Sequence, residues 1–251
     1  LDGVTVNGNI DLASATGQLR VVNDLTLNGL VEINNNSVFS FQGDNVLDGS
    51  ANIVLGNTGG SNRLILDGDG TTTFGSNVVV EGENGTIGGQ IYVAGTQMLD
   101  LNGRISANVN GGLISIVDSI VNNNGSLEAL NGGQLTLFSA VNNGSGGEIV
   151  AGTGSTVLQS GITITGGEIS TAGTGVLRAS ANSANFLDGV TVQGNIDLAS
   201  ATGIETITNN LVLNGQIDIN NNSVLGFLGD NVVSGTGQIV LGDTGGSNRL
   251  I

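Results

Sequence analysis

The stretch of sequence that decides the fold is Leu25-Thr26-Leu27-Asn28-Gly29-Leu30-Val31-Glu32-Ile33. Residues 25–27 and 31–33 alternate apolar and polar side chains, which is the period of a strand with one buried face. Asn28 and Gly29 lie between the two runs, and these residue types supply the positive φ angles of a sharp corner. The nine residues therefore predict two short strands joined by a corner.

The same phrase recurs along the chain, for example at 4–12, 162–170 and 211–219. Its corner glycines are about 21 residues apart, and each unit contains three alternating runs. Three strands and three corners in about 21 residues predict one coil of a roughly triangular parallel β-solenoid, whose strands stack at about 4.8 Å per turn. One coil cannot bury its own apolar face, so stability must come from stacked neighbours.

A longer repeat contains the short one. Residues 1–65 recur at 187–251, an offset of 186, and 45 of the 65 aligned positions are identical because 20 differ. We divide the chain into one complete long repeat of about nine rungs, 1–186, and the start of the next, 187–251, within one continuous solenoid. We expect the chain to be an excerpt of a longer array.

Composition supports an all-β chain. The sequence contains 44 Gly and no Pro, 38% of its residues are apolar, and only 3% are aromatic. Gly at this density destabilises helices, and no i, i+3, i+4 apolar stripe is present. The absence of Pro leaves every N–H available to the ladders between turns. The supply of small aliphatic side chains fits a narrow core.

Charge limits the partners that we expect. The net charge of −16, from 21 acidic residues and five Arg, should repel nucleic acid and anionic lipid. No run of 18 apolar residues predicts membrane insertion. The remaining candidate partners are neighbouring repeats of the same chain, other copies associating laterally or end to end, and surface polysaccharide.

The residue types argue against an enzyme. The chain has no His, Cys or Lys, so the common nucleophile–base pairs and thiolate or imidazole metal sites are missing. Carboxylates fall at outward strand positions, where solvation explains them: Asp11, Glu32, Asp197 and Asp218. We predict no catalytic, cofactor-binding or metal-binding residue.

Clusters of Asn have two interpretations, a polar binding stripe or structural corners and ladders. They lie at 34–36, 122–124, 142–143 and 220–222. Asn adopts left-handed conformations more readily than most residues, and its amide forms ladders between stacked strands. We favour the structural interpretation.

Two further motifs are partly similar to a calcium-binding loop and to an ice-binding face. Asp67-Gly68-Asp69-Gly70 is similar to the start of a calcium loop, but the ligand spacing and terminal Glu of an EF-hand are missing. Loosely bound calcium is the one cofactor alternative that we retain. Thr residues at strand centres would suit an ice-binding face, but matching positions also carry Asp, Asn and Val. These Thr residues are Thr5, Thr26, Thr163 and Thr191.

The phrases at 1–12 and 25–29 resemble the β-helical stalks of giant bacterial surface proteins. These are filamentous-haemagglutinin-like exoproteins, autotransporter passengers and large repeat adhesins. The resemblance implies a right-handed β-helix, export by a bacterium, and a role in attachment, matrix or surface filaments. It transfers no functional residue to this chain.

We therefore predict an extracellular structural or adhesive rod that forms a cell-surface filament, stalk or matrix fibre. The alternative is a binding module whose repeated lateral face recognises polysaccharide or a partner cell, with avidity from repetition. Loss of Asp11, Glu32 or the 34–36 cluster separates the two, because a passive rod should tolerate it.

Overall fold

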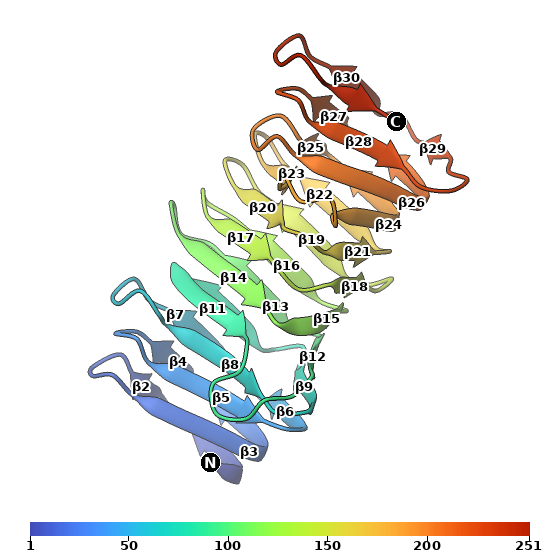
Figure 1. Cartoon of the computed structure of the whole chain (residues 1–251). Helices are drawn as coiled ribbons and strands as arrows, with labels where there is room; N and C mark the ends of the chain where they lie inside the picture. The colour runs from blue at the N-terminus through green and yellow to red at the C-terminus, as the bar shows by residue number, and fades with distance from the viewer.

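A computed structural model describes residues 1–251 as a single parallel β-solenoid of about 11 turns without any helix (Figure 1). The predicted fold class is confirmed. An average turn has about 22 residues, slightly more than the predicted 21. The turns climb from the N-terminus at one end to the C-terminus at the other (Figure 1).

No helix that could cross a membrane is present.

Three faces form the wall of the solenoid, and we number them in chain order from β1. Face 1 contains β1 (Asp2–Asn7), β6 (Asn45–Asp48), β9 (Gly70–Phe74), β12 (Gln97–Leu101), β15 (Ser119–Asn123), β18 (Val141–Asn143), β21 (Thr163–Thr165), β28 (Val224–Phe227) and β31 (Arg249–Leu250). Face 2 contains β2 (Ile10–Leu12), β4 (Leu30–Ile33), β7 (Asn52–Leu55), β10 (Val79–Gly82), β13 (Arg104–Ala107), β16 (Ser126–Ala129), β19 (Glu148–Ala151), β22 (Glu168–Thr171) and β29 (Val233–Ser234). Face 3 contains β5 (Val38–Gln42), β8 (Arg63–Asp67), β11 (Asn84–Gly88), β14 (Leu113–Val117), β17 (Gln134–Leu137), β20 (Thr156–Gln159), β23 (Val176–Ala179), β25 (Asn195–Asp197), β27 (Gln216–Ile219) and β30 (Gln238–Leu241).

Three long strands continue round a corner and so belong to two faces. The first part of β3 (Gln18–Asn28) pairs with β5 on face 3, and its last part pairs with β6 on face 1. β24 (Phe186–Gln193) and β26 (Ile204–Leu213) pass from face 1 to face 2. All strand pairs are parallel, so each turn continues the ladder of the turn before it.

The core is one column of aliphatic side chains along the axis. Stacking in register places Val31 on Ile10, and Ile53 on Val31, all pointing inward. The buried apolar residues form a single cluster of 49. The ring of Phe41 packs between those of Phe39 and Phe74 near the N-terminal end of the core, with centroids 5.0 and 6.0 Å apart. Because no turn has a core of its own, the turns stabilise one another.

Corner residues adopt the conformations that the sequence predicted. Asn35 and Asn36 have φ values of 54° and 63°, and their counterparts Asn221 and Asn222 have 53° and 65°. Gly29 is required for a different reason, since a Cβ there would lie 2.2 Å from the carbonyl oxygen of Gly8 in the turn below. Gly therefore permits close stacking at corners as well as positive φ.

Several connections are longer than the usual corner, among them 56–62, 89–96 and 180–185. The segment 67–89 fits the sequence phrase of the rungs least well, yet it contains the regular strands β9, β10 and β11. The segment 171–186, which carries extra residues in the sequence, contains β23 followed by the long connection 180–185. We call 89–96 the strap, because it folds back over β8 and β5 on the outer side of face 3 (Figure 1).

Candidate functional site

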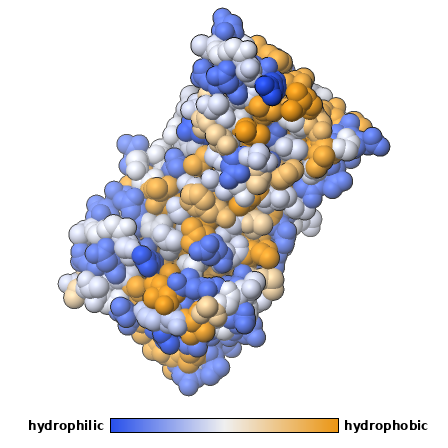
Figure 2. Space-filling model, in the orientation of Figure 1, coloured by the Kyte–Doolittle hydropathy of each residue, from blue (hydrophilic) through white to orange (hydrophobic).

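No group of three or more His, Cys, Asp or Glu side chains is placed to hold a metal ion. The lateral surface carries shallow grooves, ladders of polar side chains and the strap. Figure 2 shows that polar residues cover much of the visible side and that apolar residues are broken into separate patches among them.

A ladder of polar side chains climbs the outside of face 1. Asn122 Nδ2 donates to Asp100 Oδ1 at 2.7 Å, and Asn142 Nδ2 donates to Asn122 Oδ1 at 2.8 Å. Thr165 continues the column on the next turn. These residues line a groove of about 600 Å³ that contains no apolar side chain. The groove offers amide, hydroxyl and carboxylate groups at the spacing of the turns, the chemistry that sugar hydroxyls require.

A second Asn ladder lies inside the corner between faces 1 and 2. Asn123 Nδ2 donates to Asn143 Oδ1 at 2.7 Å, and Asn143 Nδ2 donates to the carbonyl oxygen of Glu168 at 3.0 Å. Both residues are buried. The predicted Asn clusters thus divide into corners with positive φ, at 34–36 and 220–222, and strand ladders, at 122–123 and 142–143.

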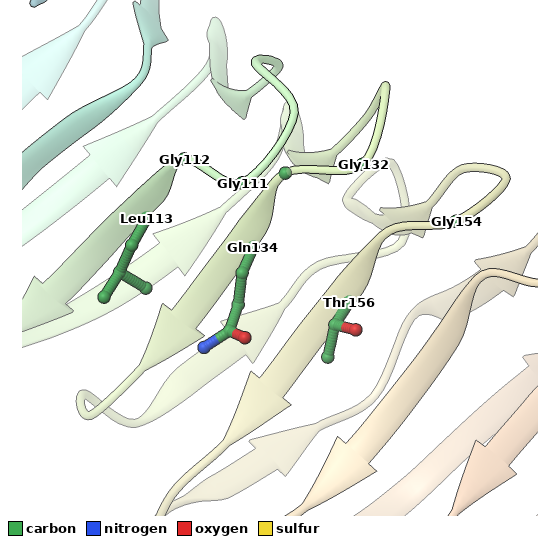
Figure 3. Close-up of a pocket in the computed structure, with 8 residues that line it drawn as sticks. Gly111, Gly112, Leu113, Gly132, Gln134, Gly154 and Thr156 are labelled. Atoms are coloured by element: carbon green, nitrogen blue, oxygen red, sulfur yellow. The ribbon is translucent and has the colours of Figure 1, made fainter. Parts of the chain in front are cut away.

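A shallow groove follows the edge between faces 2 and 3. Gly111, Gly132 and Gly154 bring the backbone of three successive turns to its rim, and its volume is about 300 Å³. The side chains of Leu113, Gln134 and Thr156, which share this groove, stand in one outward column on β14, β17 and β20, as Figure 3 shows. The groove has no charged group and only one apolar side chain, so it offers little to orient a ligand.

The strap is anchored by a buried carboxylate. Asp67 Oδ1 accepts hydrogen bonds from the backbone N–H groups of Ile91 and Tyr92 at 2.8 and 3.1 Å. The Asp67-Gly68-Asp69-Gly70 motif therefore shapes a loop through its first carboxylate, whose donors are amides. Ile65 points outward from β8 but is only 2% exposed, because the strap covers it.

The far end of the strap reaches the first turn. Tyr92 Oη lies 3.0 Å from Gln18 Oε1, and the guanidinium of Arg20 stacks 4.2 Å from the centre of the Tyr92 ring. Such a stack combines cation–π attraction with apolar contact. Tyr92 is the one Tyr of the chain, and the sequence analysis did not single it out. The sequence feature that could have pointed to Tyr92 is the stretch 88–96, where the alternating strand pattern is interrupted.

Asp11 and its counterpart Asp197 close the corners after their strands. The side-chain and backbone hydrogen bonds of Ser14 hold the pKa of Asp11 below its ordinary value. Burial acts to raise the pKa of Asp197, but hydrogen bonds from Ser200 and Arg178 outweigh it and the pKa is lowered. Arg178 Nε lies 3.0 Å from Asp197 Oδ2. These carboxylates serve local structure and remain ionised.

Glu205 is the one acidic side chain that points into the core without a charged partner. It is fully buried, next to Leu225 in the register, and its counterpart in the first long repeat is Leu19. Its Oε1 accepts only the N–H of Thr206 at 3.2 Å, and Oε2 has no partner. Burial raises the pKa of this carboxyl well above its ordinary value.

The remaining predicted positions lie on the outer surface but form no joint site. Asp11 stacks beside Glu32 on face 2, as solvated side chains. Thr5 and Thr26 stack on face 1, but the next position in their column is Asp48. Thr163 lies on face 1 far along the axis, and Thr191 lies on face 2. No flat Thr face is formed.

Comparison with known proteins gives no relative: no family model, no curated protein and no solved structure matches the chain.

Proposed function

We propose that the chain is part of an extracellular structural or adhesive rod, a filament, stalk or matrix fibre at a cell surface. The observation that carries the proposal is the unbroken parallel ladder around one core cluster of 49 residues. About 11 turns at roughly 4.8 Å each give a length of about 53 Å. The outside is made of solvated side chains and short ladders, as a spacer requires.

The acidic exterior supports the same function. A net charge of −16 gives mutual repulsion that keeps neighbouring rods apart, and salt screens it over a Debye length of about 8 Å. Nothing in the residue inventory supports catalysis, so we propose that the protein is not an enzyme and requires no cofactor.

The test is electron cryo-microscopy of the material that the producing cells make, on the cells and after release. We expect thin fibres at the cell surface with a layer line near ~4.8 Å. Intracellular particles, or fibres without this spacing, would refute the proposal. Fibres that end in a distinct globular tip would assign the chain to a stalk.

A second candidate is lateral recognition of polysaccharide, favoured by the wholly polar groove along Asp100, Asn122 and Asn142. A glycan array probed with the full chain tests it. If recognition occurs there, the double variant Asn122→Ala/Asn142→Ala loses binding and the matched variant Asp11→Ala/Glu32→Ala on face 2 retains it. If both double variants retained glycan binding equally, recognition by this groove would be refuted and the passive rod would remain as the proposed function.

A further inference from the structure

The two copies of the long repeat occupy different faces of the solenoid. Val4 begins on face 1, and following its ladder upward through β3, β6, β9, β12, β15, β18 and β21 leads in eight steps to residues 186–188 of β24. The counterpart of Val4 is Val190, which lies beyond the next corner, and residues 191–193 pair with β22 on face 2. The long repeat therefore advances by eight turns and one face.

Other residues show the same shift. Ile10 lies on face 2, whereas its counterpart Ile196 pairs with Leu177 on face 3. Val21 lies on face 3, and its counterpart Ile207 lies on face 1. The predicted nine rungs per long repeat are therefore replaced by eight and one-third turns in the observed register.

Local structure does not change with the shift. The corner in β3 has φ values of 55° at Asn23 and 68° at Asp24, and the corner in β26 has 53° at Asn209 and 76° at Asn210. The hydrogen bond from Asn23 to Asp2, 2.8 Å, recurs from Asn209 to Asp188, 2.6 Å. The corner between faces 3 and 1 and the corner between faces 1 and 2 thus accept the same sequence with the same local structure.

The twist of the solenoid acts against this shift. In Figure 1, face 3 is on the near side in the first turns, with β3 and β5, and face 1 has taken that place in the last turns, with β26 and β28. β6 of face 1 and β29 of face 2 both lie at the right edge, and they are counterparts. Counterpart strands of the two copies therefore lie on the same side of the rod, so the stacked turns twist along the axis (Figure 1).

The twist that this return requires is physically ordinary. It amounts to one-third of a revolution over eight and one-third turns, or about 14° per turn, within the range of roughly 10–35° found between neighbouring strands of twisted sheets. The number of turns and the twist therefore cancel. Counterpart strands return to the same side of the rod after one long repeat, although they belong to different faces.

We infer that the length of the long repeat is matched to the twist of the solenoid, so that equivalent lateral surfaces of successive copies point in one direction. Their spacing along the axis is about 40 Å, from eight and one-third turns of roughly 4.8 Å.

The face shift is tested by cross-linking in the 251-residue chain, which has no Cys of its own. A bifunctional bimane reagent becomes fluorescent when it joins two neighbouring thiols. We expect Glu168→Cys/Thr191→Cys to react as strongly as the reference pair Glu148→Cys/Glu168→Cys, because both pairs are in register on face 2. Thr163→Cys/Thr191→Cys should remain at background. Reaction of the Thr163 pair, or failure of the Glu168 pair while the reference pair reacts, would overturn the inference.

The compensating twist is tested by distances between spin labels on two pairs of outward positions. Glu32 and Asp218 are counterparts on different faces, whereas Glu32 and Gln193 share one column of face 2, seven turns apart. With compensation, the Glu32→Cys/Asp218→Cys distance stays near ~40 Å and the Glu32→Cys/Gln193→Cys distance clearly exceeds its axial ~34 Å. Without twist, the second distance equals ~34 Å and the first clearly exceeds ~40 Å, which would overturn the inference while leaving the rod function intact.

Discussion

At the scale of single residues, the two copies of the long repeat act as controls for each other. Counterparts at the corners have similar φ values, as at Asn35 and Asn221, so side-chain differences between the copies can be compared on a similar backbone. Glu205 in place of Leu19 is the most informative difference, because it puts a carboxyl into the apolar column.

We expect Glu205→Leu to stabilise the chain. Its folded-state pKa is raised, so the stability that depends on the bound proton is complete below the ordinary pKa of about 4.5 and is lost as pH rises through the folded value. At neutral pH the variant should gain about 1–3 kcal/mol, because the unpartnered Oε2 is removed. Denaturant unfolding between pH 4 and 8 measures it.

Two further variants show whether the change in stability comes from the charge of Glu205. Glu205→Gln keeps the shape and should flatten the pH dependence without the full gain in stability. Glu32→Gln on the outside of face 2 should follow the wild-type pH profile. The raised pKa of Glu205 would be contradicted if the free energy of unfolding of the wild type rose steadily from pH 5 to 8 and Glu205→Gln abolished that rise.

Gly29→Ala tests close stacking at corners. The new Cβ would lie 2.2 Å from a backbone oxygen, and backbone cannot move aside without separating the turns. We expect a loss of about 1–3 kcal/mol, as for other overpacked sites. Gly60→Ala is the matched control, since nothing lies within 4 Å of its Cβ and its effect should stay within about 0.5 kcal/mol in the same denaturant titration.

At the scale of elements, the strap is the connection that folds back over the outside of the solenoid (Figure 1). Tyr92→Ala removes both the contact with Gln18 and the stack under Arg20. We expect faster amide hydrogen exchange within 89–96 and a global stability change of about 1 kcal/mol or less, because the core is untouched. Hydrogen-exchange mass spectrometry measures exchange both in the strap and in the strands of the core.

Tyr92→Phe separates the two contacts of the strap. It loses the hydroxyl that contacts Gln18 but keeps the ring under Arg20, so exchange in 89–96 should lie between wild type and Tyr92→Ala. If neither variant changes exchange there, the strap is held by Asp67 alone, and the contacts with the first turn have no structural role.

At the scale of the whole molecule, the continuous core links every turn to the next. Leu127 stacks between Ile105 and Ile149 in the middle of the rod. We expect Leu127→Ala to cost about 2–5 kcal/mol and to weaken exchange protection in the turns on both sides. Val150→Ala, which points outward on the next turn, should cost far less. Loss of protection in one turn only would show that the turns unfold independently.

How much of this molecule was predictable depends on the range of the signal. Alternation and corner residues are local, so the strands at 25–28 and 30–33 and the corner at Asn35 and Asn36 followed from the sequence. The face shift did not, because counting corner glycines gives an average spacing and is blind to connections such as 56–62 and 89–96 that lengthen single turns.

The candidate site was only partly predictable for the same reason. The ladder of Asn122 and Asn142 followed from the clustering of Asn and the stacking of turns. The partners of Tyr92 did not, since Gln18 is 74 residues away and no periodic pattern joins them. Burial of Glu205 was visible only as an acidic residue replacing Leu in the second copy.

The strap gives the rod a mechanical asymmetry. A simple stack of turns under tension unfolds from its end one turn at a time, because each turn contacts only the adjacent turns. Tyr92 belongs to the connection after the fourth strand of face 3, yet it grips the first turn past β5 and β8. Tension applied at the N-terminus can detach β1 and β2 first, but it must separate Tyr92 from Gln18 and Arg20 before the first part of β3 comes free. The strap therefore adds resistance to unfolding at one place along the rod, and once its contacts break a larger part of the chain is released in one step.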